Sequence, residues 1–226
     1  MIEHPPVVHD DPPGEPPWAL QLAVRVEKAE PPSHEAVCAA AASAVVRLLA
    51  DPAFAQEVGR WEDGRIRKVV RRARGARWKD AQELPGVTVS WRGAEVRAFA
   101  PGPVTEVPAR IAKLQVAGTD LEHAAVPAPA VPYGVVALNP GAGMSTGKAA
   151  AQSGHAAHLL YRSLGPAERG SWLENGAPVH LAEVPWDEAV ARAAVRVRDA
   201  GYTEVAPGTM TAVAWLVTGL PGAASG

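Results

Sequence analysis

Hydrophobic and polar positions along the chain switch repeatedly between the two-residue period of strands and the longer period of helices. The first half predicts a strand at 20–26, helices at 33–49 and 52–62, a strand from about 66 followed by a helix at 77–84, strands at 87–91 and 94–99, a helix at 104–111 and a strand at 113–116. The second half predicts a strand at 133–138, helices at 146–163 and 166–174, a strand at 179–184, a helix at 186–193 and strands at 194–198 and 210–217. This alternation is typical of the α/β class.

The order of elements in the first half returns in the second half. Local sequence repeats as well, because the stretch around Trp61 that ends at Gly64 resembles the stretch around Trp172 that ends at Gly176, and residues 100–103 resemble 206–209. We therefore expect a tandem duplication of two α/β/α-layered domains, each with a small mixed four-stranded sheet. The predicted divisions are a disordered Pro-rich tail (1–17), a first copy (18–117), a linker rich in Ala and Pro (118–132) and a second copy (133–220).

Charge is distributed unevenly over these divisions. The tail, the middle of the chain (18–117) and the remainder carry net charges of −4, +5 and −3, which together give the −2 of the 226-residue chain. The single cysteine, Cys38, excludes an internal disulfide framework and fits a reducing cytoplasm. The acidic start lacks the apolar region of a signal peptide, and no apolar run approaches the roughly 20 residues that span a bilayer. We expect a cytoplasmic protein without membrane contact.

The helix predicted over 146–163 carries the first candidate site. Lys148, Gln152 and His155 recur at i, i+4 and i+7, so they share one face of an otherwise Ala-rich helix. Ser145 or Thr146 is suited to cap the helix, and Gly165-Pro166 to stop it. Spacing alone favours an ordinary solvated polar face.

Two familiar kinds of site are not supported by these residues. Gly147-Lys148 suggests a phosphate-binding loop, but such a loop needs an earlier glycine where Ala142 stands and a hydroxyl residue where Ala149 stands. His155 and His158 have the i, i+3 spacing of helical metal ligands, but no Cys or acidic cluster supplies a third ligand. We expect neither a nucleoside triphosphatase nor a metal site, and no cofactor.

A second candidate stretch runs from Asp199 to Thr211. An acid at a strand end, followed by Gly and hydroxyl residues, commonly places a carboxylate at the edge of a sheet. The plainer interpretation is a turn in which Asp199 caps local amides.

Together the two stretches resemble the type II peptidyl-tRNA hydrolases. The first matches the pattern G-K-x-x-A-Q-x-x-H-A over 147–156, and the second matches D-A-G-x-T-x-[IV]-x-x-G-[ST]-x-T over 199–211. The resemblance covers about residues 133–217 and implies a hydrolase-like fold for the second copy. Two long motifs in the right order are a more specific signal than either alone.

The resemblance implies roles for individual residues. Lys148, Asp199 and Thr203 match catalytic positions. Gly147, Gln152, His155, Thr209 and Thr211 match positions that bind or orient the substrate. The chain departs from the family where Asn139-Pro140-Gly141 replaces the usual Arg-x-Asp and where Tyr202 replaces a basic residue. Both changes remove charge that would serve tRNA affinity rather than ester chemistry.

The first copy lacks these motifs and instead carries eight basic residues between positions 65 and 79. Phosphate contacts supply most of the sequence-independent affinity for nucleic acid. One interpretation is that the first copy grips the tRNA backbone through the following residues: Arg67, Lys68, Arg71, Arg72, Arg74 and Arg77. The other is a solvated face that balances the acidic tail.

The sequence therefore predicts an enzyme that hydrolyses the ester between a peptide, or an N-blocked aminoacyl group, and tRNA. The alternative is a non-catalytic module that binds tRNA or protein and keeps the fold. Because members of the family form homodimers, the resemblance also implies either an intramolecular pseudo-dimer of the two copies or a homodimer of the chain.

Overall fold

The fold was analysed in a computed structural model of the chain, which describes residues 10–199 and 204–219. The elements of the first half are β1 (Trp18–Arg25), α1 (His34–Ala50), the 3-10 helix η1 (Pro52–Phe54), α2 (Ala55–Glu62), β2 (Lys68–Ala73), α3 (Ala76–Gln82), β3 (Gly86–Trp91), β4 (Ala94–Phe99), β5 (Gly102–Pro103) and α4 (Ala109–Ala112). Those of the second half are β6 (Tyr133–Leu138), the 3-10 helix η2 (Pro140–Ala142), α5 (Thr146–Ser163), α6 (Pro166–Glu174), β7 (Val179–Leu181), α7 (Trp186–Arg192), β8 (Val195–Arg198) and β9 (Met210–Val217).

Each half forms a mixed sheet, and the two sheets have the same strand order and directions. The orders are β2-β1-β4-β3 and β7-β6-β9-β8. In each, the first two strands of the half are parallel, and the remaining pairs are antiparallel. The prediction of an α/β fold with two mixed sheets is confirmed. The first sheet has five strands rather than four, because the short β5 also pairs with β1.

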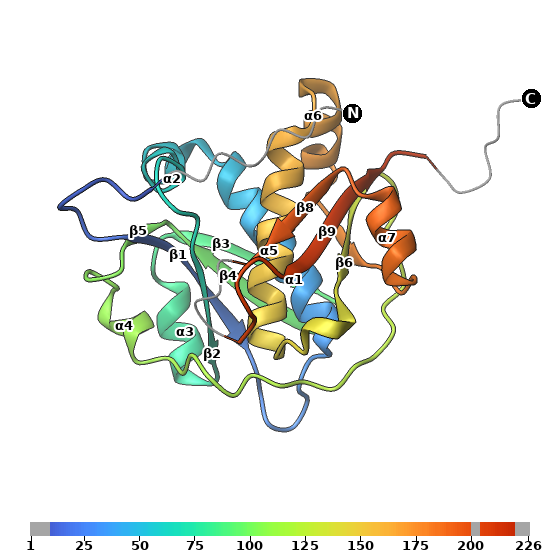
Figure 1. Cartoon of the computed structure of the whole chain (residues 1–226). Helices are drawn as coiled ribbons and strands as arrows, with labels where there is room; N and C mark the ends of the chain where they lie inside the picture. The colour runs from blue at the N-terminus through green and yellow to red at the C-terminus, as the bar shows by residue number, and fades with distance from the viewer. Residues whose placement is uncertain (1–9, 200–203, 220–226) are drawn as a thin grey trace, which may run out of the picture.

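Helices α1 and α5 lie side by side in the centre of the molecule, between the two sheets (Figure 1). Each helix packs on its own sheet and also on one strand of the other half, α1 on β7 and α5 on β2. The helices run in the same direction: the His34 ring lies 3.0 Å from the Thr146 hydroxyl at their first residues, and Val45 packs against Gly154 further along. One hydrophobic core therefore extends through both halves.

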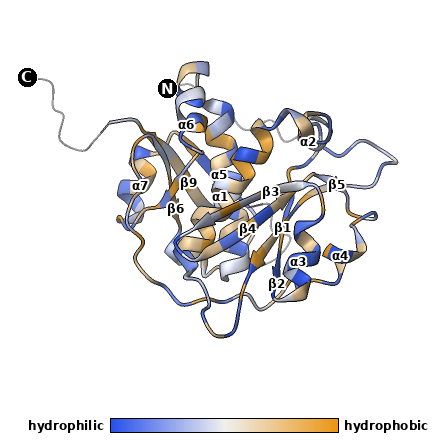
Figure 2. Cartoon of the chain, turned by 180° about the vertical axis from the view of Figure 1, so that it is seen from behind, coloured by the Kyte–Doolittle hydropathy of each residue, from blue (hydrophilic) through white to orange (hydrophobic). Residues whose placement is uncertain are grey.

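The strands alternate their side chains between this central core and smaller outer cores. On β1, Leu20, Leu22 and Val24 face the central helices, whereas Ala23 faces a cluster under α3 and α4. On β6, Val136 faces inward and Ala137 faces α7. Figure 2 shows the same arrangement from behind, with α1 and α5 between the sheets and α3, α4 and α7 on the outside.

Local chemistry explains the helix boundaries. The hydroxyl of Ser33 accepts a hydrogen bond from the Ala36 amide, and that of Ser145 accepts one from the Lys148 amide, so the two central helices have the same kind of N-cap. Pro166 begins α6, as expected of a proline in the first turn of a helix. The cap at Ser145 fixes where the polar side chains of α5 begin.

Several sequence-based expectations about single elements were wrong. The helix expected at 104–111 is limited to four residues because Pro108 begins it, and the strand expected at 113–116 is a single bridge between Arg72 and Gln115. The likeness between residues 100–103 and 206–209 has no structural counterpart, since the former follow β4 and the latter precede the equivalent strand β9. The likeness around Trp61 and Trp172 does have one.

The two tryptophans occupy equivalent places. Both side chains are fully buried, and each indole N–H donates to the carbonyl oxygen of the residue just before the parallel strand: Trp61 to Arg67 at 3.2 Å and Trp172 to Pro178 at 2.9 Å. Within the described residues the two halves thus share a detail of packing as well as topology.

The predicted tail and linker both contact the body of the protein. Asp10 and Asp11 pair with Arg65 and Arg67, and Glu15 pairs with Arg60, while residues 1–9 lie outside the described part. The linker contains no helix or strand, but its backbone bonds to the first turns of both central helices. Glu122 accepts from the His34 amide, and Thr119 accepts from the Gly147 amide.

Candidate active site

The Asp199 carboxylate is the centre of the candidate site. It follows β8, and it is tied to the strand that comes next because its amide donates to the Thr209 carbonyl (2.9 Å) and its carbonyl accepts from the Gly208 amide (2.7 Å). These two bonds close the ends of the connection between β8 and β9. The carboxylate is therefore held in place at the end of the strand, in a buried residue.

Two donors from α5 meet one oxygen of this carboxylate. The Lys148 ammonium and the Gln152 amide both donate to Oδ2 of Asp199, the latter at 2.7 Å. The side chains of Lys148 and Asp199 are 12% and 6% exposed, so solvent screens this ion pair little. The helix face seen in the sequence and the strand-end acid thus form one site.

Gln152 has a fixed orientation. Its amide oxygen accepts a 2.8 Å hydrogen bond from the hydroxyl of Thr211, which is fully buried on β9. The amide nitrogen must then face Asp199. The chain Thr211–Gln152–Asp199 links three elements and orients the carboxylate.

The start of α5 holds a further acid that the sequence interpretation did not include. The amide and the hydroxyl of Ser145 both donate to the carboxylate of Glu204, at 2.9 and 2.8 Å. Backbone amides and the helix dipole make such an N-terminus favourable for negative charge. Glu204 lies inside the 199–211 motif, so the motif was the available signal, but only the fold shows that the loop returns to α5.

His155 lies next along the same face, half-buried. Burial, followed by the positive charge of Lys68 and then by His158 and Lys148, holds the pKa of His155 well below its usual range. The imidazole is therefore neutral at pH 7. Its Nδ1 lies 3.4 Å from the Nζ of Lys68, a residue of the first half.

The remaining predicted positions are distributed as follows. Thr209 contributes its backbone carbonyl to Asp199, and Gly147 donates its amide to the linker. Thr203 and Tyr202 lie outside the described residues. Asn139 caps η2 through the Gly141 amide and donates to the Met210 carbonyl, so it connects β6 to β9 where the resemblance leads one to expect charge.

The basic residues predicted to contact tRNA do not form one patch. Arg67 pairs with Asp11, Lys68 lies against α5, and Arg71 donates to Gln21 and to the Leu114 carbonyl. Arg72 donates to Gln115 and the Gly118 carbonyl, and Arg77 to the Lys113 carbonyl, in exposed positions. Arg74 is exposed too. Strand alternation places Arg71 on the opposite face of β2 from Lys68 and Arg72, whereas Arg67, Arg74 and Arg77 lie outside that strand.

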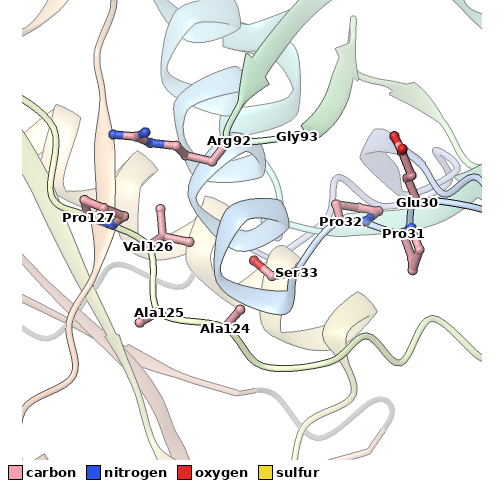
Figure 3. Close-up of a pocket in the computed structure, with 10 residues that line it drawn as sticks. All are labelled: Glu30, Pro31, Pro32, Ser33, Arg92, Gly93, Ala124, Ala125, Val126 and Pro127. Atoms are coloured by element: carbon pink, nitrogen blue, oxygen red, sulfur yellow. The ribbon is translucent and has the colours of Figure 1, made fainter.

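The first half has a cavity, of about 360 Å³, at the place that corresponds to the candidate site (Figure 3). It lies at the start of α1 beside the turn that follows β3, and the linker forms one of its walls. Its lining comprises Glu30, Pro31, Pro32, Ser33, Arg92, Gly93, Ala124, Ala125, Val126 and Pro127. Neither this lining nor α1 supplies an acid–lysine pair like that of Asp199 and Lys148.

Two further features bear on the kind of site. Within residues 10–199 and 204–219, no group of three His, Cys, Asp or Glu side chains is placed to hold a metal ion. No single helix in the same residues has the length and apolar character to cross a membrane; the bent pair formed by α1 with η1 and α2 passes that test jointly.

Comparison with known proteins adds a family to this geometry. Residues 134–216 match the family model described as "Peptidyl-tRNA hydrolase PTH2", and no curated protein matches the chain significantly. The matched region contains Lys148, Gln152 and Asp199 and all four strands of the second sheet except the first residue of β6 and the last residue of β9. Over residues 134–216, the second half of the chain is therefore similar to the PTH2 peptidyl-tRNA hydrolase family.

Proposed function

We propose that the second half hydrolyses the ester bond that joins a peptide, or an N-blocked aminoacyl group, to tRNA, and so recycles peptidyl-tRNA in the cytoplasm. The observation that carries the proposal is the meeting of Lys148 and Gln152 with Asp199 inside the family match. Residues from two separate motifs form one buried polar cluster. Neither motif taken alone predicts that its polar side chains meet those of the other.

Asp199 is suited to act on the attacking water. Ester hydrolysis needs a water molecule that is oriented or deprotonated, and a group that stabilises the negative charge that develops on the carbonyl oxygen. Gln152 and the backbone of Thr209 hold the carboxylate in place. In our mechanism Asp199 orients or deprotonates the water.

Lys148 is suited to stabilise the negative charge that develops during the reaction. It stands in the first turn of α5, where its charge adds to the positive end of the helix dipole. We assign it to the developing oxyanion or to the phosphate of the tRNA 3′ end. The bond between Ser145 and Glu204 supports this assignment, because an anion of the chain itself already binds at this helix start.

The neighbouring residues orient the substrate. Gln152 and Thr211 keep Asp199 in position, and His155 offers a neutral ring further along the helix. Gly147 and Thr209 shape the backbone on either side of the site. Thr203 would hold the water or the ribose, as the family resemblance implies.

The test is cleavage of an N-blocked aminoacyl-tRNA by the purified chain beside its Asp199→Asn variant. We expect cleavage by the wild type and a loss of at least about a hundredfold in the variant, because the base or water-orienting group is removed. An asparagine keeps the shape of the side chain, and Arg92→Ala in the first half serves as control. Equal rates for wild type and Asp199→Asn would refute the mechanism.

A binding module without catalysis is the alternative. Asn139 favours it, since this residue at the end of β6 is engaged in holding β6 to β9 and carries no charge. Tight tRNA binding without any cleavage by the wild type would select this alternative.

We further propose that the first half grips the tRNA backbone. Arg72, Arg74 and Arg77 are the members of the basic set that support this, because they lie near the end of β2 and the start of α3, where Arg74 and Arg77 are exposed and Arg72 is partly exposed. Changing all three to Gln should reduce the salt dependence of tRNA binding by about one unit of slope for each phosphate that is no longer neutralised. Arg192→Gln on α7 is the control, and a slope that stays constant in the triple variant would argue against the grip.

We also propose that the two halves arose by tandem duplication and pair as an intramolecular pseudo-dimer. Equal strand orders, equivalent tryptophans and the reciprocal packing of α1 on β7 and α5 on β2 support this. A chain that is monomeric by light scattering at micromolar concentration is the expected outcome.

A further inference from the structure

Lys68 of the first half has surroundings that the proposed reaction does not yet explain. It begins β2, where α5 of the second half crosses the sheet. Its stem packs on α5 at Gly154, where an added Cβ would lie 3.5 Å from the Lys68 Cδ. This is ordinary van der Waals contact, so the stem lies against the helix and the amine reaches the histidines of α5.

The hydrogen-bond partners of the amine are histidine rings, while Glu62 acts on it through its charge. Its Nζ lies 3.4 Å from Nδ1 of His155, 3.5 Å from Nδ1 of His158 and 4.7 Å from the centre of the Trp61 ring. Among the described residues its hydrogen-bond partners include no carboxylate. Lys68 is half-buried, and a lysine withdrawn from water usually has an acid as its hydrogen-bond partner.

The hydrogen bonds of His158 determine which atoms donate and which accept among Lys68, His158 and Glu62. Its Nε2 lies 2.6 Å from Oε1 of Glu62, a carboxylate that Arg162 also binds at 2.9 Å. A carboxylate accepts, so Nε2 of His158 carries the proton. Burial lowers the pKa of His158 to about 4, so the ring is neutral and its Nδ1 must accept the N–H of Lys68.

The same reasoning applies to His155. In its charged form Lys68 has only donors, so in that state Nδ1 of His155 accepts from it and the ring proton is on Nε2. Nε2 of His155 has no hydrogen-bond partner among the described residues. His155 therefore has a spare N–H donor, one helical turn beyond Gln152 on the face that carries Lys148.

The equivalent place in the other half shows that packing alone does not need this network. The bonds from Trp61 and Trp172, and the pairing of β1 with β2 and of β6 with β7, make Val179 the counterpart of Lys68. Counting from the N-caps Ser33 and Ser145, Ser43 is the counterpart of His155. Val179 is buried in the central core, and Ser43 donates to the Gly176 carbonyl. A valine and a serine fill this contact in one half, whereas the other has lysine and histidine.

We propose that Lys68 is a positioning residue of the second half's site: by donating to Nδ1 it fixes His155 with its proton on Nε2, ready to donate to an oxygen of the bound ester or of the terminal nucleotide. The proposal rests on the proposed hydrolase function for the identity of the substrate. It makes the active site composite, because a strand of the first half completes it.

The experiment compares wild type, Lys68→Met, Lys68→Arg and Lys28→Met in the full chain. Methionine keeps the length of the side chain but cannot donate, arginine still donates, and Lys28 is an exposed lysine in the loop after β1. The ring state of His155 is read by NMR of ¹⁵N-labelled histidine, with His155→Gln used for assignment. Thermal unfolding confirms that each variant is folded.

We expect the Nε2–H form of His155 in wild type, Lys68→Arg and Lys28→Met, and a mixture with the Nδ1–H form in Lys68→Met. Cleavage of N-blocked aminoacyl-tRNA should fall by up to about a hundredfold in kcat in Lys68→Met, since misplaced groups cost that much, and should recover in Lys68→Arg. An unchanged His155 ring in Lys68→Met overturns the proposal, as does a changed ring with unchanged kcat. If the wild type cleaves no ester, the hydrolase function fails, and the NMR result still decides whether Lys68 positions His155.

Discussion

The two halves of the molecule have the same strand order and differ most where the candidate site lies. In the first half β3 and β4 are joined by a two-residue turn, Arg92-Gly93, with both residues at positive φ. In the second half the same connection runs from Asp199 to Thr209 and returns to the start of α5 through Glu204. A longer connection between equivalent strands therefore provides the acid.

The central helices differ in the same way. Counting from their N-caps, Ala36 and Ala40 of α1 stand where α5 has Lys148 and Gln152. All four positions lie on well-formed helices, and both alanines are fully buried. Helix formation and packing are satisfied by alanine, so the polar pair on α5 calls for another explanation, which the proposed chemistry supplies.

The largest expected effect tests what the halves share. Replacing Trp61 or Trp172 by Ala removes a fully buried ring and its hydrogen bond to the backbone beside the parallel strand. Each change should lower the free energy of unfolding by about 3–5 kcal/mol, measured by urea denaturation. Similar losses support equivalent roles; a loss in one variant much below the other would break the structural equivalence.

The second prediction tests what the halves do not share. Lys148→Ala should lower kcat/KM for N-blocked aminoacyl-tRNA by about 10²–10³, the effect of removing a group that stabilises a developing oxyanion. Ala36→Ser at the equivalent place on α1 is the matched control and should leave the rate unchanged. Full activity in Lys148→Ala would remove the lysine from the mechanism.

Much of the second half was predictable from the sequence because its signals are local. The bounds of β6, α5, α6 and β9 agree with the expected ones, since Ser145, Pro166 and the flanking glycines mark element ends directly. Pairing Lys148 with Asp199 could be anticipated only through the family resemblance. Strand order, which decides that β8 ends beside α5, is not encoded in either motif alone.

Other features depend on tertiary packing and were not predictable. Lys68 sits in a run of basic residues, and nothing local distinguishes it from Arg72, yet the former contacts α5 and the latter bonds to Gln115. The sequence does contain one sign that two helices lie between the two sheets. Residues 36–42 of α1 are apolar on every side, which is typical of a helix that is buried all round. Which element covers each face was not visible.

The third prediction addresses the contact between the halves. A Cβ at Gly154 would lie 3.0 Å from Cγ2 of Val45, so Gly154→Val should push α1 and α5 apart and cost about 1–3 kcal/mol. Gly170→Ala on α6 is the control, because nothing lies within 4 Å of its added Cβ. That change should stabilise by about 0.5–1 kcal/mol through helix propensity alone. A stable Gly154→Val protein would show that the helices are not tightly apposed.

The last prediction uses the titration of Lys68 as a measure of the asymmetry between the halves. The amine is faced by His155, His158 and Arg162 on α5 and by Glu62 on α2, and burial lowers its pKa from 10.5 to about 7. In the unfolded chain it stays protonated up to its ordinary pKa, so between pH 7 and 10.5 the unfolded state binds more protons than the folded one. Stability contributed by this group therefore rises with pH across that window and is lost as the pH falls toward 7.

Lys68→Met should remove that slope, which is at most about 1.4 kcal/mol per pH unit. The measurement is the free energy of unfolding of both proteins at intervals from about pH 7 to about pH 8.5, inside the window where the two states differ in bound protons. Above this range Cys38 acts in the opposite direction, because burial raises the pKa of its thiol and favours the protonated form in the folded state. Arg72→Met should keep the wild-type slope. Parallel curves for wild type and Lys68→Met would mean that the amine is as well hydrated in the fold as in the unfolded chain, and that the second half does not enclose it.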